Sequence, residues 1–198
     1  MTFPADITAI QDELTLHWHQ DVSAAAGGGV EALVIQQHRQ NFALWHEEDR
    51  ARSTLASAEE IAQTKRNIDL LNQIRNDLVE ALDQELLQQL ESNGVNMTGE
   101  LHSETPGMII DRLSILSLKI FHTREQTARK DAALEHIQRN RERLDVLLRQ
   151  RKELSECLIA LWNDVQTGRR RFKLYRQLKM YNDPNLNPEI YGEKTGER

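Results

Sequence analysis

The segment from Ser103 to Gln126 is apolar around almost its whole circumference, and it constrains the fold more than any other part of the chain. Thr105 is placed to cap a helix, and Pro106 to occupy the first helical position, where a missing N–H costs no hydrogen bond. The isoleucine, leucine and phenylalanine side chains that follow leave little polar surface, so this helix must be covered by neighbouring helices. The chain is therefore predicted to be an all-α, antiparallel helical bundle.

Nine glycines and four prolines in 198 residues leave few points at which helices are interrupted. Helical spacing of apolar residues predicts helices over residues 6–20, 30–52, 57–90, 106–126, 131–168 and 169–181. Ser57 and Glu60 form a capping box at the start of the third helix, and Asp131 is predicted to cap the fifth. This pattern predicts five or six helices, two of them long, in one domain over residues 1–183, followed by an extended tail over residues 184–198.

Charge and composition restrict the classes of function. A net charge of -6 argues against general nucleic-acid binding. No apolar run approaches the roughly 20 residues that cross a bilayer, and the N-terminus has no secretion signal. The single Cys157 excludes an internal disulfide, fits a reducing compartment and is predicted to pack in the core. We expect a cytoplasmic protein, with peripheral attachment to the inner membrane as an open alternative.

Three of the predicted helices carry polar residues in the middle of an apolar face. In residues 30–52 this stripe surrounds Trp45, which is predicted to be a buried anchor. In residues 57–90 it centres on Arg75, and in the interior helix on Asp111, Arg112 and Lys119. Charged groups on core faces are costly unless they are paired. The three stripes are therefore predicted to meet at one level of the bundle.

Two interpretations of this polar cluster remain open. It is either a structural network that fixes the register of the helices or a ligand site. As a site, its guanidinium groups suit phosphate, its carboxylates suit sugar hydroxyls, and Trp45 suits a ring. The predicted ligand-binding residues are Asn41, Trp45, Arg52, Asn72, Arg75, Glu104, Arg112 and Lys119, and the predicted acid–base residues are Glu48, Asp49 and Asp111. The predicted ligand is a phosphorylated sugar or nucleotide sugar.

No resident metal site is predicted from the sequence. The histidine spacing lacks the Glu-x-x-His pattern of di-iron bundles, and there is no cysteine pair. The cofactor is left unknown, with hydrated Mg²⁺ held by the carboxylates as an open option.

A basic segment near the C-terminus is predicted to form a short amphipathic helix. Its cations are Arg169, Arg170, Arg171, Lys173, Arg176 and Lys179. They indicate either a solvated face or a surface for an anionic partner such as a membrane.

Four segments carry a family resemblance: NFALWHEEDRAR (Asn41–Arg52), KRNIDLLNQIRND (Lys65–Asp77), SETPGMIIDRLSILSLKI (Ser103–Ile120) and GRRRFKLYRQLKMYNDPNLNP (Gly168–Pro188). In these segments the chain resembles a bacterial family of helical proteins known as a domain of unknown function. The resemblance implies an α-helical fold and a gene neighbourhood of glycosyltransferases for lipopolysaccharide or other envelope glycans. It implies no reaction and no catalytic residue.

Three functions follow as alternatives. The first is a cytoplasmic factor of envelope-glycan synthesis that binds a phosphorylated sugar or nucleotide sugar. The second is a non-catalytic adaptor that docks a glycosyltransferase or the inner membrane through the basic segment. The third is a Mg²⁺-dependent phosphohydrolase. Whether the chain is an enzyme, and whether its long helices pair in a homodimer, stay open.

Overall fold

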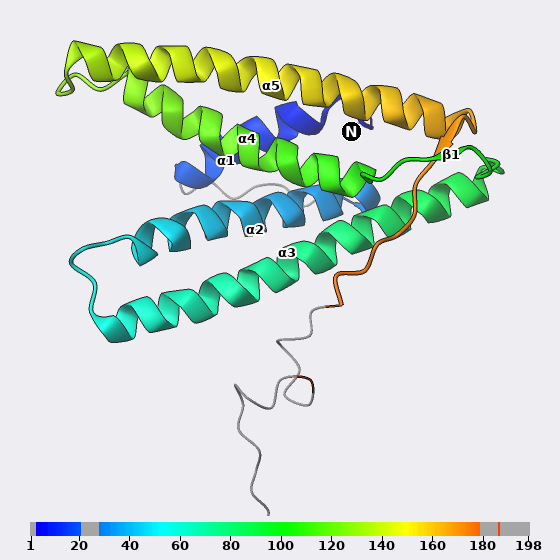
Figure 1. Ribbon diagram of the computed structural model, residues 1–198, viewed down its shortest axis with the longest axis horizontal. Coiled ribbons are helices and arrows are strands. Elements are labelled where there is room, and N and C mark those ends of the chain that lie inside the picture. Colours follow the sequence, from blue (N-terminus) through cyan, green and yellow to red (C-terminus); the bar gives the residue numbers. More distant parts are fainter. Residues whose placement is uncertain (1–2, 21–27, 179–185, 187–198) are drawn as a thin grey trace, which may run out of the picture.

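The computed structural model describes residues 3–20, 28–178 and 186. Five helices pack against one another, which confirms the all-α prediction (Figure 1). Their bounds are α1 (Ile7–His19), α2 (Gly29–Ala51), α3 (Ala58–Ser92), α4 (Pro106–Thr127) and α5 (Leu134–Gln166). As predicted, two of them, α3 and α5, are long. Within the described residues, no helix has the length and apolar character needed to cross a membrane.

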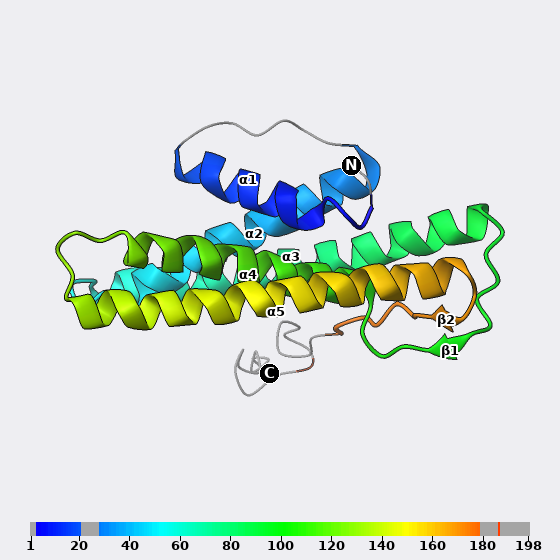
Figure 2. The ribbon, with the colours of Figure 1, turned by 90° about the horizontal axis from the view of Figure 1, so that it is seen from above.

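The bundle consists of two helical hairpins with α1 laid across them. Helix α2 packs along α3, and α4 packs along α5 (Figure 1). Helix α1 contacts α4 and α2 and covers one side of the bundle, as the view from above shows (Figure 2). Helix α4 contacts each of the other four helices and so takes the interior position predicted for it.

The hydrophobic core forms where α3, α4 and α5 meet. Leu82, Leu86 and Leu90 project from α3 towards Ile109, Ile110 and Leu113 of α4, and all six are at most 2% exposed. Helix α5 completes the core with a stripe of side chains at helical spacing: Leu154, Leu158, Leu161, Trp162 and Val165. This packing fixes the position of α4 along α3. It thereby also fixes where the polar side chains of Asp111 on α4 and Arg75 on α3 lie relative to one another.

Two helices, α3 and α4, begin at the N-cap residues predicted from the sequence, whereas α5 does not. Ser57 and Glu60 form the predicted capping box, and the Thr105 hydroxyl accepts a hydrogen bond from Met108 N at 3.2 Å. The cap predicted at Asp131 is wrong. Helix α5 begins three residues later, at Leu134, because Asp131 is held by Arg129 at 2.6 Å and Ala133 takes the N-cap position.

The start of α4 is fastened to α3 by the buried Asp83. Its carboxylate accepts hydrogen bonds from the Thr105 hydroxyl and from Gly107 N, the latter at 2.7 Å. A Cβ on Gly107 would lie 2.8 Å from Asp83 Oδ1 and 2.9 Å from the Val79 carbonyl oxygen, so only glycine permits this approach. Burial raises the pKa of Asp83 to about 6, although both hydrogen bonds oppose that shift.

The helix predicted for residues 169–181 is wrong over the described part. Gly168 takes a φ of +71° and ends α5, after which β2 (Arg170–Arg171) pairs in parallel with β1 (Glu100–Leu101). Phe172 is 2% exposed and inserts into the core, which draws residues 172–178 along the bundle in an irregular conformation (Figure 2). We call residues 172–178 the C-terminal strap. Lys179 and almost all of the predicted tail lie outside the described residues.

Two burial predictions also need correction. Cys157 is exposed, because the neighbouring Leu154, Leu158 and Leu161 turn the other side of α5 towards the core. Trp45 was expected to be buried, but it is only half-buried because one part of its ring borders a pocket.

We predict that Asp83→Ala lowers the free energy of unfolding by about 2–4 kcal/mol, since the Thr105 hydroxyl and Gly107 N–H lose a charged, buried acceptor. Urea denaturation measures this change. Asp77→Ala removes an exposed carboxylate from the same helix and is expected to cost at most about 0.5 kcal/mol. Equal costs for the two variants would contradict the anchoring role of Asp83.

Candidate functional site

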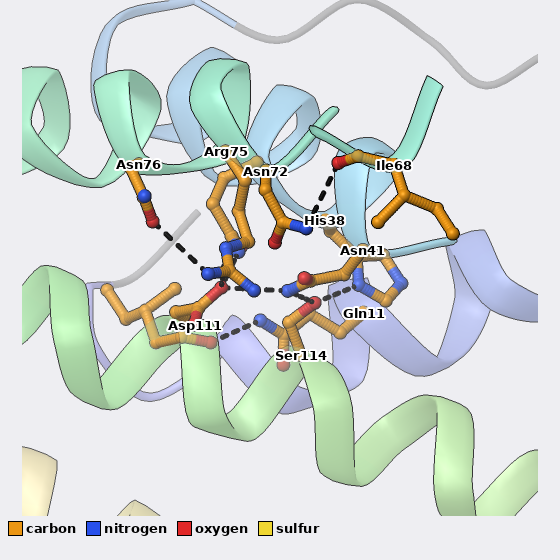
Figure 3. A network of polar contacts seen from close by, with 11 residues as sticks. Gln11, His38, Asn41, Ile68, Asn72, Arg75, Asn76, Asp111 and Ser114 are labelled. Atoms are coloured by element: carbon orange, nitrogen blue, oxygen red, sulfur yellow. Dashed lines mark hydrogen bonds and ion pairs between the residues drawn. The ribbon is translucent and has the colours of Figure 1, made fainter. Parts of the chain in front are cut away.

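The centre of the polar cluster is Asp111 on α4. Its Oδ1 accepts hydrogen bonds from Gln37 Nε2 at 2.5 Å and from Asn41 Nδ2 at 2.9 Å, both on α2. Arg75 Nε of α3 lies 3.8 Å from the same oxygen. Side chains of three helices therefore meet at one carboxylate, as Figure 3 shows.

A buried chain of hydrogen bonds extends from this centre to α1. The Thr15 hydroxyl donates to the Gln11 carbonyl oxygen at 2.7 Å, so it can only accept from His38 Nε2, 3.0 Å away. His38 Nδ1 then carries no proton and accepts from the Ser114 hydroxyl at 2.7 Å. Ser114 Oγ in turn accepts from Asn41 Nδ2 at 2.9 Å. The contacts thus place a proton on His38 Nε2, and in a neutral ring Nδ1 is the acceptor.

The energetics of His38 agree with this assignment. The side chain is fully buried, and burial lowers its pKa to about 4, because a charged imidazolium would lose its hydration. A hydrogen bond involving Gln11 and the charge of Asp12 oppose the shift but do not cancel it. His38 is a neutral connector between Thr15 and Ser114 at physiological pH.

Arg75 is incompletely satisfied. Its Nη2 donates to Asn76 Oδ1 at 3.2 Å. Its Nε is buried and has no hydrogen-bond partner in the part of the chain that the structure describes. A buried donor without an acceptor is costly, so this position favours binding of an additional acceptor atom or a shift of Arg75 towards Asp111.

Arg75 lies in the wall between two pockets, each with a volume of about 320 Å³. The first, which we call the Trp45 pocket, is lined by Asn41, Leu44, Trp45, Glu48, Asp49, Arg52, Asn72, Arg75, Ile115 and Leu118. The second, the Tyr175 pocket, is lined by Arg75, Asn76, Val79, Glu80, Asp83, Glu104, Thr105, Met108, Asp111, Arg112, Tyr175 and Gln177.

The two pockets bring together all but one of the predicted site residues. Asn41, Trp45, Glu48, Asp49, Arg52 and Asn72 line the Trp45 pocket, Glu104, Asp111 and Arg112 line the Tyr175 pocket, and Arg75 lines both. Lys119 is in neither pocket. It projects to solvent from α4, and so does Arg112, whose Nη1 contacts Glu104 Oε1 at 2.6 Å. The expectation that Arg112 and Lys119 face the core was wrong, because their shared face is the outward one.

The ring that stacks on Trp45 was not predicted from the sequence. The indole stacks on the His122 ring with centroids 4.6 Å apart and planes 8° apart, and His122 Nδ1 lies 2.8 Å from Glu125. The rings of His19 and His46 lie 5.0 and 6.1 Å from that of His122. These histidines come from three helices, so spacing within one helix does not reveal them. Nevertheless, no group of three or more side chains in residues 3–20 and 28–178 is arranged to hold a metal ion.

The tertiary partners of the cluster were also missed. Gln37 and Ser114 complete the hydrogen bonds around Asp111 and Asn41, and Tyr175 closes the second pocket from a distant segment. A glutamine or serine on a helix carries no distinguishing pattern. The signal that was available was His38, placed one turn before Asn41 on the apolar face of α2.

Comparison with family models matches residues 31–174 to the family described as Protein of unknown function (DUF4254). The chain belongs to the DUF4254 family. Among curated proteins and among solved structures, no match was found. The matched region runs from α2 to the C-terminal strap and contains every residue that lines the Trp45 pocket.

We predict that His38 makes stability fall with acidification. Its folded pKa of about 4 lies below the usual 6.5, so the unfolded chain takes up the proton first. This contribution to the free energy of unfolding is complete above pH 6.5 and declines by about 3 kcal/mol as the pH falls to 4. Denaturation curves of the wild type and His38→Gln between pH 4 and 8 isolate the effect, because Asp83 titrates in both. Parallel curves would contradict it.

Proposed function

We propose that the protein binds a phosphorylated sugar or nucleotide sugar in the Trp45 pocket, with a phosphate oxygen at Arg75. The observation that carries the proposal is Arg75, which lines the pocket and whose buried Nε lacks a hydrogen-bond partner in the described chain. A phosphate oxygen is a charged acceptor that forms a strong hydrogen bond with a guanidinium donor. Asp111, 3.8 Å away, holds the Arg75 side chain in the wall.

The rest of the lining supports the same class of ligand. Trp45 offers one side of a ring whose other side is backed by His122, which limits its motion. Asn41 uses both Nδ2 hydrogens within the protein, so it offers a ligand its Oδ1 as an acceptor. Asn72 Nδ2 donates to the Ile68 carbonyl oxygen and keeps one hydrogen, as well as Oδ1, for a hydroxyl. Arg52 lies at the mouth, where its Nη2 contacts Glu48 Oε2 at 2.9 Å, and a phosphate would compete with that exposed carboxylate.

Acid–base chemistry in this proposal falls to Glu48 and Asp49 rather than to Asp111. Asp111 Oδ1 already accepts two amide hydrogen bonds, so Asp111 orients Arg75. Glu48 and Asp49 line the same pocket and are the carboxylates within reach of a bound ligand. If hydrated Mg²⁺ accompanies the phosphate, the same pair serves a phosphohydrolase, which is the alternative enzyme class.

We place this binding activity in the synthesis of bacterial envelope glycans. The support is the family resemblance of the four sequence segments, which implies a gene neighbourhood of envelope-glycan glycosyltransferases. Nucleotide sugars and sugar phosphates are accordingly the first probes.

We predict that a panel of nucleoside diphosphate hexoses, tested with and without Mg²⁺, includes one that raises the thermal unfolding temperature. Arg75→Gln is expected to weaken its binding by about 10–100-fold in calorimetric titration, the effect of losing a charged hydrogen bond. Arg75→Lys keeps the charge and is expected to recover part of the affinity. Arg66→Gln removes an exposed arginine from the same helix and serves as the control.

The competing structural network gives a different result. If Arg75 serves only to hold the helices in register, Arg75→Gln lowers the unfolding temperature while no probe stabilises the wild type. A panel without any stabilising compound, or an affinity unchanged in Arg75→Gln, would overturn the proposal.

A second candidate is the adaptor that docks an anionic surface, and the exposure of Lys173 and Arg176 on the strap favours it. The three preceding arginines are engaged within the protein: Arg169 and Arg170 contact Asp164, and Arg171 Nε donates to the Gly99 carbonyl oxygen at 3.0 Å.

We predict for this candidate that binding to vesicles containing phosphatidylglycerol falls as salt rises and is lost in Lys173→Gln/Arg176→Gln. Cosedimentation measures it, and Lys152→Gln/Arg149→Gln on the exposed side of α5 is the matched control. Equal binding by both double variants would exclude the strap as the docking surface.

A further inference from the structure

We infer that the Tyr175 pocket is a second subsite of the same ligand site and takes the uncharged sugar of a nucleoside diphosphate sugar. This inference rests on the proposed function, because it needs a phosphate at Arg75. It goes further in assigning the two ends of the ligand. The nucleobase lies against Trp45, the diphosphate lies beside Arg75 and Arg52, and the sugar lies beneath the C-terminal strap.

The two pockets share a boundary. Arg75 lines both of them, and Asp111 in the Tyr175 pocket accepts a hydrogen bond from Asn41 in the Trp45 pocket. Figure 3 shows Arg75, Asn41 and Asp111 converging at this boundary. Each volume of about 320 Å³ is at the lower limit for a small-molecule pocket, whereas the two together suit a larger, two-part ligand.

The charge of the Tyr175 pocket determines which part of the nucleoside diphosphate sugar binds there. Four carboxylates line it, from Glu80, Asp83, Glu104 and Asp111, against the guanidinium groups of Arg75 and Arg112. Arg112 is already paired with Glu104 at 2.6 Å. A second phosphate there would face an excess of negative charge. Sugar hydroxyls, in contrast, donate to carboxylates, which retain acceptor positions after one or two hydrogen bonds.

The strap supplies the outer wall of this subsite. Its first residue, Phe172, is anchored in the core, and Gln177 N donates to Glu80 Oε1 at 2.8 Å, which holds the strap against α3. Tyr175 lies between these two anchors and lines the pocket. An aromatic ring opposite carboxylates is a common arrangement for a sugar, whose C–H face packs on the ring while its hydroxyls reach the acids.

The path of the strap is set by β1 and β2. A Cβ on Gly99 would lie 2.5 Å from the carbonyl oxygens of Gly168 and Arg169, so the two segments approach as closely as backbone allows. His102 N donates to the Arg171 carbonyl oxygen at 2.8 Å and extends the pairing towards Glu104. The same contact thus positions Glu104 on one side of the pocket and the strap on the other.

Calorimetric titration of the full chain tests the inference with the nucleoside diphosphate hexose that binds best and with its matching nucleoside diphosphate. We expect Tyr175→Ala and Glu104→Gln each to weaken the hexose conjugate by about tenfold, with less than a twofold change for the diphosphate alone. Tyr175→Phe keeps the ring and is expected to bind like the wild type. Lys173→Ala, on the same strap and outside the pocket, is the control.

The outcomes separate the two proposals. If the hexose conjugate and the diphosphate bind equally, and Tyr175→Ala changes neither, the second subsite is refuted while phosphate binding at Arg75 stands. If Tyr175→Ala weakens both ligands alike, the strap acts on the phosphate side and the assignment is also wrong. If neither ligand binds the wild type, both proposals fail.

Discussion

The arrangement of the polar interior depends on the carboxylate of Asp111. It lies on α4, which contacts each of the other four described helices, and it draws Gln37 and Asn41 from α2 and Arg75 from α3 towards one point. A carboxylate in this position is stable only when several donors surround it. The donors come from two helices, α2 and α3, and the carboxylate comes from α4, so the relative heights of these three helices are fixed by a polar contact as well as by the leucine and isoleucine core.

Beyond Asp111, the hydrogen bonds through Ser114, His38 and Thr15 bring α1 into the same network. Each hydroxyl along this chain both donates and accepts, and the neutral imidazole does the same. Most donors and acceptors of this chain are therefore paired, whereas Gln11 Oε1, Gln37 Oε1 and Arg75 Nε are buried without a hydrogen-bond partner in the described residues. Of these three residues, Arg75 lines both pockets, so the proposed phosphate is assigned to it.

Local signals in the sequence predicted much of the fold, and tertiary contacts account for what they missed. Thr105, Ser57 and the apolar stripes depend on neighbours within one or two turns, so the helices they predict are present. The two polar stripes, one around Trp45 and the other around Arg75, also predicted which residues gather around the pockets. The irregular conformation of the strap was not predicted, because its basic and apolar residues are interleaved at a spacing that also fits an amphipathic helix. The helix is prevented by Gly168, which ends α5, and by the burial of Phe172 in the core. Lys119 was predicted on the wrong face of α4. This helix is apolar around most of its circumference, so the sequence does not show which of its few polar residues face solvent.

β1 (Glu100–Leu101) pairs in parallel with β2 (Arg170–Arg171), and the whole α4–α5 hairpin lies between these two strands in the sequence. Such a contact joins residues far apart along the chain, and it forms only after the hairpin has folded back on itself. During synthesis the ribosome must release residues well beyond α5 before this closure can occur. The carboxylate-rich Tyr175 pocket therefore acquires its outer wall, the C-terminal strap, as one of the last steps of folding.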